Sequence, residues 1–305
     1  MKTVGVIIDK WIASRRNIKR TSLIFMHMVD TMDKHSNGKS NEILSNCEVI
    51  NNKNGYSFIS FFADVGALTS FTLRFFREVI RPPYEFNEFL KQSYLIGVKS
   101  LSLVGITGFI MGFVLTIQSR PTLAVFGAES WLPAMVAISI VREIGPVITA
   151  VICAGKIGSS IGAELASMKV TEQIDAMEVS GINPFNYIVV TRVLACTFMI
   201  PLLTIFADAI GLIGGFMGVN IQGDTSFSLY FLQVFNSLAF VDVFPSLIKS
   251  FFFGQAVGII GCYKGYSCNS GTEGVGKAAN SAVVMASLAI FIIDMIAVQI
   301  TSFFM

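Results

Sequence analysis

The stretch VREIGPVITAVICAGKIGSSIGAELASMKVTEQIDAMEVSGIN, from Val141 to Asn183, decides how this chain is built. It begins as an apolar segment that contains an Arg-Glu pair, continues through closely spaced small residues, and ends in a short acidic segment. The acidic end is too polar to lie in lipid. A long apolar helix that passes directly into a polar one is typical of a membrane subunit that presents a surface to a soluble partner.

The composition of the whole chain indicates a membrane protein. Of its 305 residues, 53% are hydrophobic and 14% are charged, and the mean hydropathy is +0.67. Soluble domains usually contain about 25% charged residues. Five cysteines without regular spacing and two histidines predict no metal site. The first apolar run, Val4 to Ile8, is too short for a signal peptide. We therefore expect an all-α polytopic membrane protein.

Five segments have the length of about 20 residues that a bilayer requires. The second continues as helix to about Ala166, and the third is long enough to tilt or to contain a break near Gly214-Gly215. The predicted spans are Tyr94–Ile117, Trp131–Ala154, Ile188–Val219, Val243–Tyr263 and Ser281–Phe304.

The chain before these spans divides into two parts. Residues 1–55 read as a cytoplasmic extension and linker, whose first part is either a basic amphipathic helix on the membrane surface or a solvated arm. Residues 56–92 contain a two-faced helix from Ser57 to Arg81, which Pro82-Pro83 ends. A span would be apolar all round, so we expect this helix to lie in the interface without crossing. Residues 93–305 form the membrane domain.

The distribution of lysine and arginine predicts the orientation of the spans. Fourteen of the 22 basic residues precede Ser100, whereas none lies between Asn220 and Asp242. Basic residues favour the cytoplasmic side. The N-terminus is therefore expected in the cytoplasm and the C-terminus outside.

The acidic segment at 171–180 reads as a short helix on the cytoplasmic side. Thr171 is the expected N-cap, and Gly181 with Pro184 is the expected stop. Val170, Ile174 and Met177 form an apolar stripe beside an acidic face. The helix either packs on its own bundle or couples the chain to an ATPase. The candidate coupling residues are Glu172, Gln173, Asp175, Met177 and Glu178.

The stretch from Val141 to Pro184 resembles the signature of the MlaE-type ABC transporter permease family. The resemblance extends through IPLLTIFADAIGLIGG (Ile200–Gly215) and GTEGVGKAA (Gly271–Ala279), and covers roughly Phe61 to the C-terminus. It implies a permease homodimer in a bacterial inner membrane, with two ATPase subunits below and a periplasmic MCE-domain protein above. It also implies that the system moves phospholipid between the inner and outer membranes. Residues 1–55 lie outside the resemblance.

One motif has the spacing of a nucleotide-binding loop. Gly271, Gly276 and Lys277 match Walker A, but Ala278 replaces the hydroxyl residue that would bind Mg²⁺, and a span precedes the loop in place of a strand. We therefore expect a flexible connection between the fourth and fifth spans. The chain is expected to bind no cofactor and to be no enzyme, with ATP bound by the partner subunit.

Ionisable residues inside the spans form the last candidate site. A charge at the bilayer centre costs about 2.5–3.5 kcal/mol even on lenient scales, so each should face protein or water. The depths of Lys249 and Asp294 on consecutive antiparallel spans predict that they pair, with Arg142 and Glu143 as a neighbouring cluster. These charges either lock the bundle or form a polar zone that moves during transport. The role of Asp208 stays open.

Two other functions remain to be weighed against a lipid permease. A secondary transporter or channel would usually show internal repeats, and none is visible between the two halves of the chain. A non-transporting scaffold is disfavoured by the charges inside the spans. No Ser/His/Asp constellation predicts a catalytic residue.

Overall fold

The computed structural model describes residues 64–80, 85–221, 225–268 and 271–304. The chain divides into two units, residues 1–67 and 68–305. Of the first unit only residues 64–67 are described, and they begin a helix that runs to residue 79. The predicted extension at 1–55 and residues 57–63 of the predicted interfacial helix lie outside the described residues.

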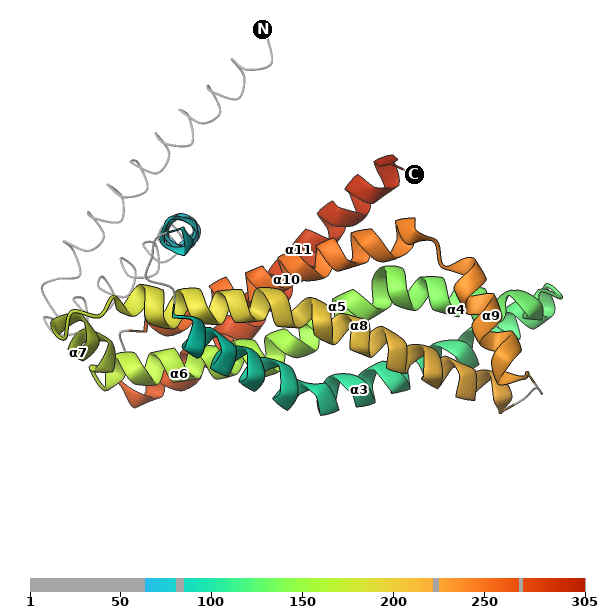
Figure 1. Cartoon of the computed structure of the whole chain (residues 1–305), viewed down its shortest axis with the longest axis horizontal. Coiled ribbons are helices and arrows are strands. Elements are labelled where there is room, and N and C mark those ends of the chain that lie inside the picture. Colours follow the sequence, from blue (N-terminus) through green and yellow to red (C-terminus); the bar gives the residue numbers. More distant parts are fainter. Residues whose placement is uncertain (1–63, 81–84, 222–224, 269–270, 305) are drawn as a thin grey trace, which may run out of the picture. The chain divides into compact units, whose positions relative to one another are not determined.

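Five described helices are long and apolar enough to cross a membrane, which confirms the predicted all-α polytopic fold. Each helix starts before the predicted span because its polar ends continue the same helix. They are α3 (Phe86–Val125), the composite helix Glu129–Val170, the composite helix Phe185–Asn220, α10 (Phe240–Tyr266) and α11 (Thr272–Phe304) (Figure 1).

The second and third of these helices contain irregular turns. In the second, η2 and η3 are single π-helical turns, and in the third η4 (Phe185–Val190) precedes α8 (Thr191–Asn220). Because α8 is continuous through Gly214-Gly215, the third span has no break there. The second helix consists of η1 (Glu129–Trp131), α4 (Leu132–Ser139), η2 (Ile140–Ile144), α5 (Gly145–Cys153), η3 (Ala154–Gly158) and α6 (Ser159–Val170).

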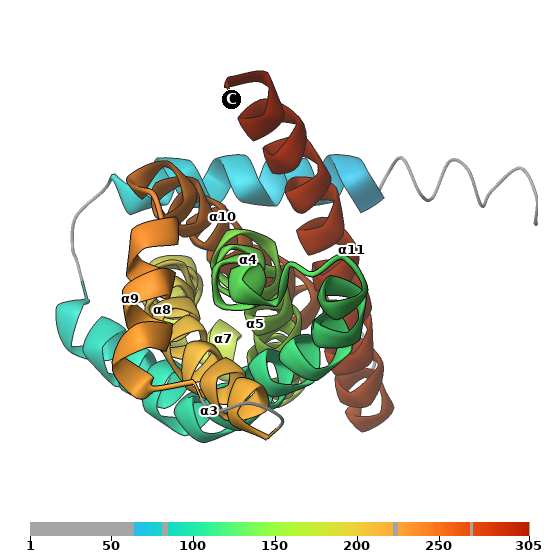
Figure 2. The same ribbon diagram turned by 90° about the vertical axis from the view of Figure 1, so that its right-hand side faces the viewer.

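The third span is the central helix of the bundle. In its most apolar stretch 67% of the residues are buried, compared with 22% for α3 and 17% for α11. α3 packs along one side of α8 and α10 packs along another (Figure 2). The backbones of α3 and α8 meet so closely that a Cβ atom added at Gly112 would collide with the carbonyl of Gly211. Glycine is what permits this approach between helices in lipid.

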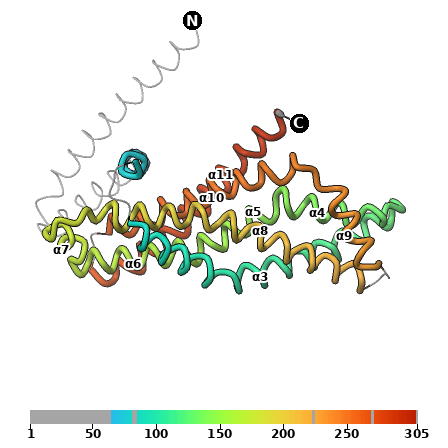
Figure 3. The backbone as a smooth tube through the Cα atoms, in the orientation of Figure 1, coloured from blue at the N-terminus to red at the C-terminus, as the bar shows by residue number. Residues whose placement is uncertain are grey.

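A short helix that the sequence patterns did not predict, α9 (Phe227–Ser237), follows the third span. The hydroxyl of Ser226 accepts a hydrogen bond from the N–H of Leu229 and caps it. Tyr230 and Val234 are fully buried. α9 lies at one end of the bundle and α7 (Gln173–Val179) lies at the other (Figure 3).

The Walker-like segment is not the flexible connection that we expected. α11 begins at Thr272, so Gly276 and Lys277 lie in its first turns, and Lys277 pairs with Glu273 at 2.7 Å. The run of Glu, Val, Lys and Ala favours helix strongly enough to outweigh its glycines.

Within the second unit, the helical residues 68–79 pack on the bundle through aromatic side chains. The ring of Phe71 lies 5.1 Å from that of Phe185 and 5.5 Å from that of Tyr263. Arg74 places its guanidinium 4.3 Å from the ring centre of Phe185. Residues 68–79 run across the direction of the bundle helices (Figure 2).

Candidate functional site

Lys249 joins three helices in the membrane-spanning part of the bundle. Its ammonium donates to Glu143 Oε2 at 2.8 Å and to Asp294 Oδ1 at 3.1 Å. The side chain is only 4% exposed. The predicted pairing of Lys249 with Asp294 is confirmed. Glu143 is a second partner that the depth argument placed nearby without pairing it, so one cation is shared by two carboxylates from two other helices.

Glu143 owes its position to the π-helical turn η2. In this turn the N–H of Gly145 bonds to the carbonyl of Ile140, five residues earlier. Pro146 follows, and it has no N–H to offer the carbonyl of Arg142. The extra residue rotates the Arg142-Glu143 pair relative to a regular helix. Turns of this kind are frequent at functional sites.

Arg142 faces a different partner from Glu143. Its guanidinium lies 3.9 Å from Asp242 Oδ1 in the first turn of α10. The other oxygen of Asp242 accepts a hydrogen bond from the N–H of Ala239 at 3.2 Å and caps that helix. Sequence reasoning missed Asp242 as a site residue. Its signal was an acidic residue at a helix start, two turns before Lys249 on the same helix.

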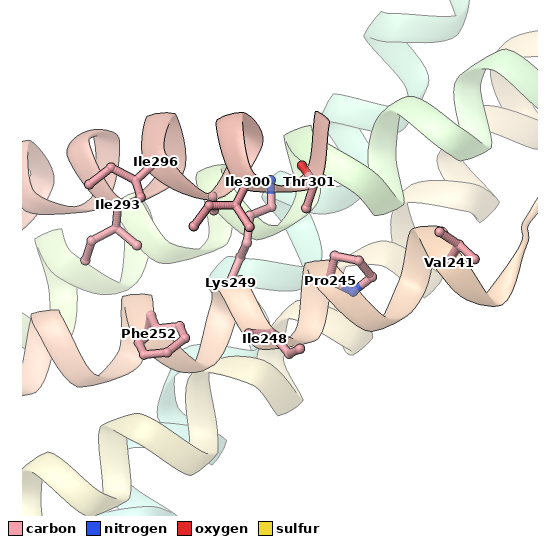
Figure 4. A pocket seen from close by; sticks show the side chains of 10 residues that line it. Val241, Pro245, Ile248, Lys249, Phe252, Ile293, Ile296, Ile300 and Thr301 are labelled. Carbon is pink, nitrogen blue, oxygen red and sulfur yellow. The ribbon is translucent and has the colours of Figure 1, made fainter. Parts of the chain in front are cut away.

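The charged cluster opens into an apolar cavity of about 480 Å³ between α10 and α11. Figure 4 shows Lys249 reaching from α10 toward α11 among the aliphatic side chains that line the cavity. A smaller pocket that contains Arg142, Glu143 and Asp242 shares the Lys249 wall. A cavity with apolar walls and a few charged groups at one side suits an amphiphile. The lining includes Val241, Pro245, Ile248, Phe252, Ile293 and Ile300.

Asp208 lies apart from this cluster. No ion pair joins it to the other charges in the described part of the chain, and its Oδ1 is buried without a hydrogen-bond partner there. A Cβ atom added at Gly145 would collide with this oxygen. Gly145 is therefore required where α5 leaves the π-helical turn, because Asp208 occupies the space beside it.

The second candidate site is α7, at the end of the bundle opposite α9 (Figure 1). Thr171 does not cap it, contrary to the prediction. Its hydroxyl donates back to Ser167 and closes α6, and Glu172 stands at the N-cap in the left-handed region with φ 57°. The stop at Gly181 is confirmed. With φ 79°, this residue donates to Glu178, and Ile182 donates to Met177.

The candidate coupling residues do not all point the same way. Glu172, Gln173, Asp175 and Glu178 are exposed, whereas Met177 is half-buried against the bundle core. Asp175 accepts a hydrogen bond from Lys169 at 2.8 Å.

Two apolar side chains on this end were missed by sequence reasoning. Val179 is 90% exposed and Ile182 is 47% exposed, although neither belongs to a membrane-spanning helix. The spacing already carried this signal, because on a helix Val179 falls opposite the stripe of Val170, Ile174 and Met177 and among the acidic side chains.

The surroundings of α7 are tied to the bundle on both sides. Arg192, which is buried, donates to Glu164 Oε1 at 2.7 Å and so joins α8 to α6. Asn183 accepts hydrogen bonds from the N–H groups of Phe185 and Asn186. The helices on either side of α7 are therefore joined to each other, and the turn that follows α7 is capped.

Comparisons with known proteins agree with this architecture. The family model described as "Permease MlaE" matches residues 89–300. A probable ABC transporter permease protein of Rickettsia felis is 38% identical over 243 residues, which cover 80% of this chain and 94% of that protein. The intermembrane phospholipid transport system permease protein MlaE of Haemophilus influenzae is 37% identical over 209 residues, which cover 68% of this chain and 80% of that protein. The chain therefore belongs to the MlaE family of ABC transporter permeases.

Proposed function

We propose that this chain is the membrane subunit of a transporter that moves phospholipid between the inner and outer membranes of a bacterium, driven by a separate ATPase through α7. The relative from Haemophilus influenzae is named for intermembrane phospholipid transport. The observation that carries the coupling is the exposed surface of α7, where Val179 stands among Glu172, Asp175 and Glu178. We call these four residues the α7 surface.

The α7 surface suits a pocket with an apolar floor and a basic rim. Val179 fills the pocket, and the three carboxylates meet lysine or arginine around it. The partner binds and hydrolyses ATP, so this chain holds no cofactor and performs no catalysis itself. Two ATPase subunits serve two copies of the permease, and a periplasmic MCE-domain protein docks at the α9 end.

The sharing of Lys249 by two carboxylates allows the helices that carry them to move relative to one another. Because two carboxylates hold Lys249, either Glu143 or Asp294 can separate from it while the other keeps the charge paired. Losing both partners at once would be far more costly. We infer that α10 and α11 part and close during transport, and that the cavity between them receives lipid acyl chains as they do.

The orientation follows from the same arrangement. The α7 end faces the cytoplasm, in agreement with the basic residues on that side. The N-terminus is then cytoplasmic, and the C-terminus of α11 is periplasmic. A cysteine introduced at Lys91 should react only with cytoplasmic reagents, and one introduced at Phe235 only with periplasmic ones.

The test is purification of the complex from its native membrane, followed by a transfer assay. We expect an ATPase to co-purify and ATP to drive phospholipid from donor to acceptor vesicles. Transfer without any ATPase would favour a secondary transporter. An ATPase that co-purifies without any lipid transfer would favour a scaffold.

A further inference from the structure

A second apolar groove lies between α3 and α8, away from the α10–α11 cavity. It has a volume of about 660 Å³ and is lined by α3 from Leu90 to Leu101 and by α8 from Met199 to Ala209. On α3 the lining is nearer the α7 end, whereas the α10–α11 cavity includes the α9-side half of α10. α8 packs against both α3 and α10, so the two openings belong to different helix pairs.

One polar group in this groove has no partner. Ser93 is 6% exposed, lines the groove, and makes no hydrogen bond through Oγ with any described residue. Hydroxyls inside helices usually donate to the carbonyl four residues earlier. Thr107 and Thr116 on the same helix do so, to Leu103 and Gly112. Ser93 therefore leaves a buried hydroxyl donor without a partner among the described residues, and an unsatisfied buried donor costs free energy.

The rim of the groove carries groups suited to a lipid headgroup. Tyr94 lines the groove and is 62% exposed. Lys91 lies one turn away, with its side chain 67% exposed and only a 3.4 Å contact to Glu88. Tyrosine and lysine at a helix end are typical of the level of lipid phosphates.

The length of the groove fits one leaflet. From Leu90 to Leu101 the helix rises about 16 Å, at about 1.5 Å per residue. Half of the roughly 30 Å hydrocarbon core of a bilayer is about 15 Å. An acyl chain that starts at the level of Leu90 and follows the groove to Leu101 would therefore end near the middle of the membrane.

We propose that the groove between α3 and α8 is a binding site for one phospholipid of the leaflet on the α7 side. Its acyl chain lies along Val98, Leu101, Leu202 and Phe206. An ester carbonyl accepts the free hydrogen of the Ser93 hydroxyl, and the phosphate meets Lys91 and Tyr94. The site needs neither ATP nor a partner subunit, so its failure would leave the proposed transport function standing.

The test uses the full chain in phosphatidylcholine vesicles that contain a trace of phosphatidylcholine with a photoreactive diazirine in one acyl chain. After illumination and digestion, mass spectrometry locates the labelled peptides. We expect label concentrated between residues 90–101 and 199–209. Ala209→Trp, which places a large ring among the lining side chains of the groove, should reduce the labelling about tenfold, as a loss of about 1.4 kcal/mol would. The matched control is Val284→Trp, on an exposed face of α11 that lines neither opening.

A second variant keeps the shape of the groove and removes only the donor. Ser93→Ala should lower labelling about fivefold, the effect of one neutral hydrogen bond, and Ser93→Thr should restore part of it. Labelling around Val284 as strong as in the groove would overturn the proposal, as would labelling that neither groove variant changes. Disulfide formation between Val98→Cys residues of two copies would overturn it too, by showing that a second chain covers the groove.

Discussion

The charges inside the spans and the acidic side chains of α7 differ in how they are neutralised. Lys249 is buried and satisfied within the chain by two carboxylates. Glu172 and Glu178 are exposed, and neither forms an ion pair with any described residue. The first arrangement is complete in one chain. The acidic side chains and the exposed Val179 of α7 have no such partners within the chain, so we expect a second molecule to contact them.

The largest effect should come from Lys249→Met. This change leaves Glu143 and Asp294 facing each other without a cation. Breaking a buried pair costs about 3–5 kcal/mol. We expect a large fall in the thermal unfolding temperature of the purified chain and loss of lipid transfer. Asp294→Asn is the control: because Glu143 still holds Lys249, its stability should fall much less. Equal losses in the two variants would show that the cation is not shared in the way the geometry indicates.

The next effect concerns binding and not folding. Reversing Glu172 and Glu178 to lysine should weaken ATPase binding about a hundredfold, since like charges across an interface cost several kcal/mol. The unfolding temperature should not change, because both side chains are exposed. Surface plasmon resonance between permease and ATPase measures the first, and calorimetry the second. Undiminished affinity would remove α7 from the interface.

A third comparison separates the two faces of α7. Val179→Ala should weaken ATPase binding about tenfold without loss of stability, because the side chain is exposed in the isolated chain. Met177→Ala should do the reverse and destabilise the chain by about 1 kcal/mol, less than a fully buried site would. Parallel binding and unfolding measurements on both variants decide the matter. If Met177→Ala alone weakened binding, the sequence-based assignment of Met177 to the contact would be the better one.

The smallest effects test the backbone at the two ends of α7. Glu172 holds a left-handed conformation that costs a residue with a side chain about 1–2 kcal/mol. Glu172→Gly should therefore stabilise the chain by about 1 kcal/mol while weakening ATPase binding. Gly181→Ala should destabilise it by a similar amount, since Gly181 is also left-handed. Chemical denaturation of both variants measures whether the free energy of unfolding rises or falls in each. A Glu172→Gly variant less stable than wild type would mean that the side chain contributes more than the strain costs.

The sequence was sufficient where one strong physical constraint applied. Lipid thickness predicted the five spans, and the cost of burying charge predicted the contact between Lys249 and Asp294. The sequence was not sufficient where several weak local preferences competed. Thr171 and Glu172 are both acceptable at a helix start, and only the path of the chain between α6 and α7 decides which residue caps which helix.

Other features depended on contacts between distant residues. α9 has no charge to mark a polar face, so its pattern of Phe, Leu and Tyr reads neither as a span nor as a surface helix. The π-helical turn that aims Glu143 at Lys249 leaves no local signature beyond Pro146. Asp242 was recognised as a site residue only because the structure places it beside Arg142, and Val179 only because the structure leaves it exposed.

The close meeting of α3 and α8 has a mechanical consequence. Helices whose backbones touch at Gly112 and Gly211 cannot slip past one another by a residue without a carbonyl striking a Cβ atom. We therefore expect α3 and α8 to stay together during the proposed transport cycle, while other helices move. α11 is the least buried of the five described spans, and part of its length lines the cavity beside α10, so we expect it to move most. A disulfide across α3 and α8 should leave transport intact, whereas one across α10 and α11 should stop it.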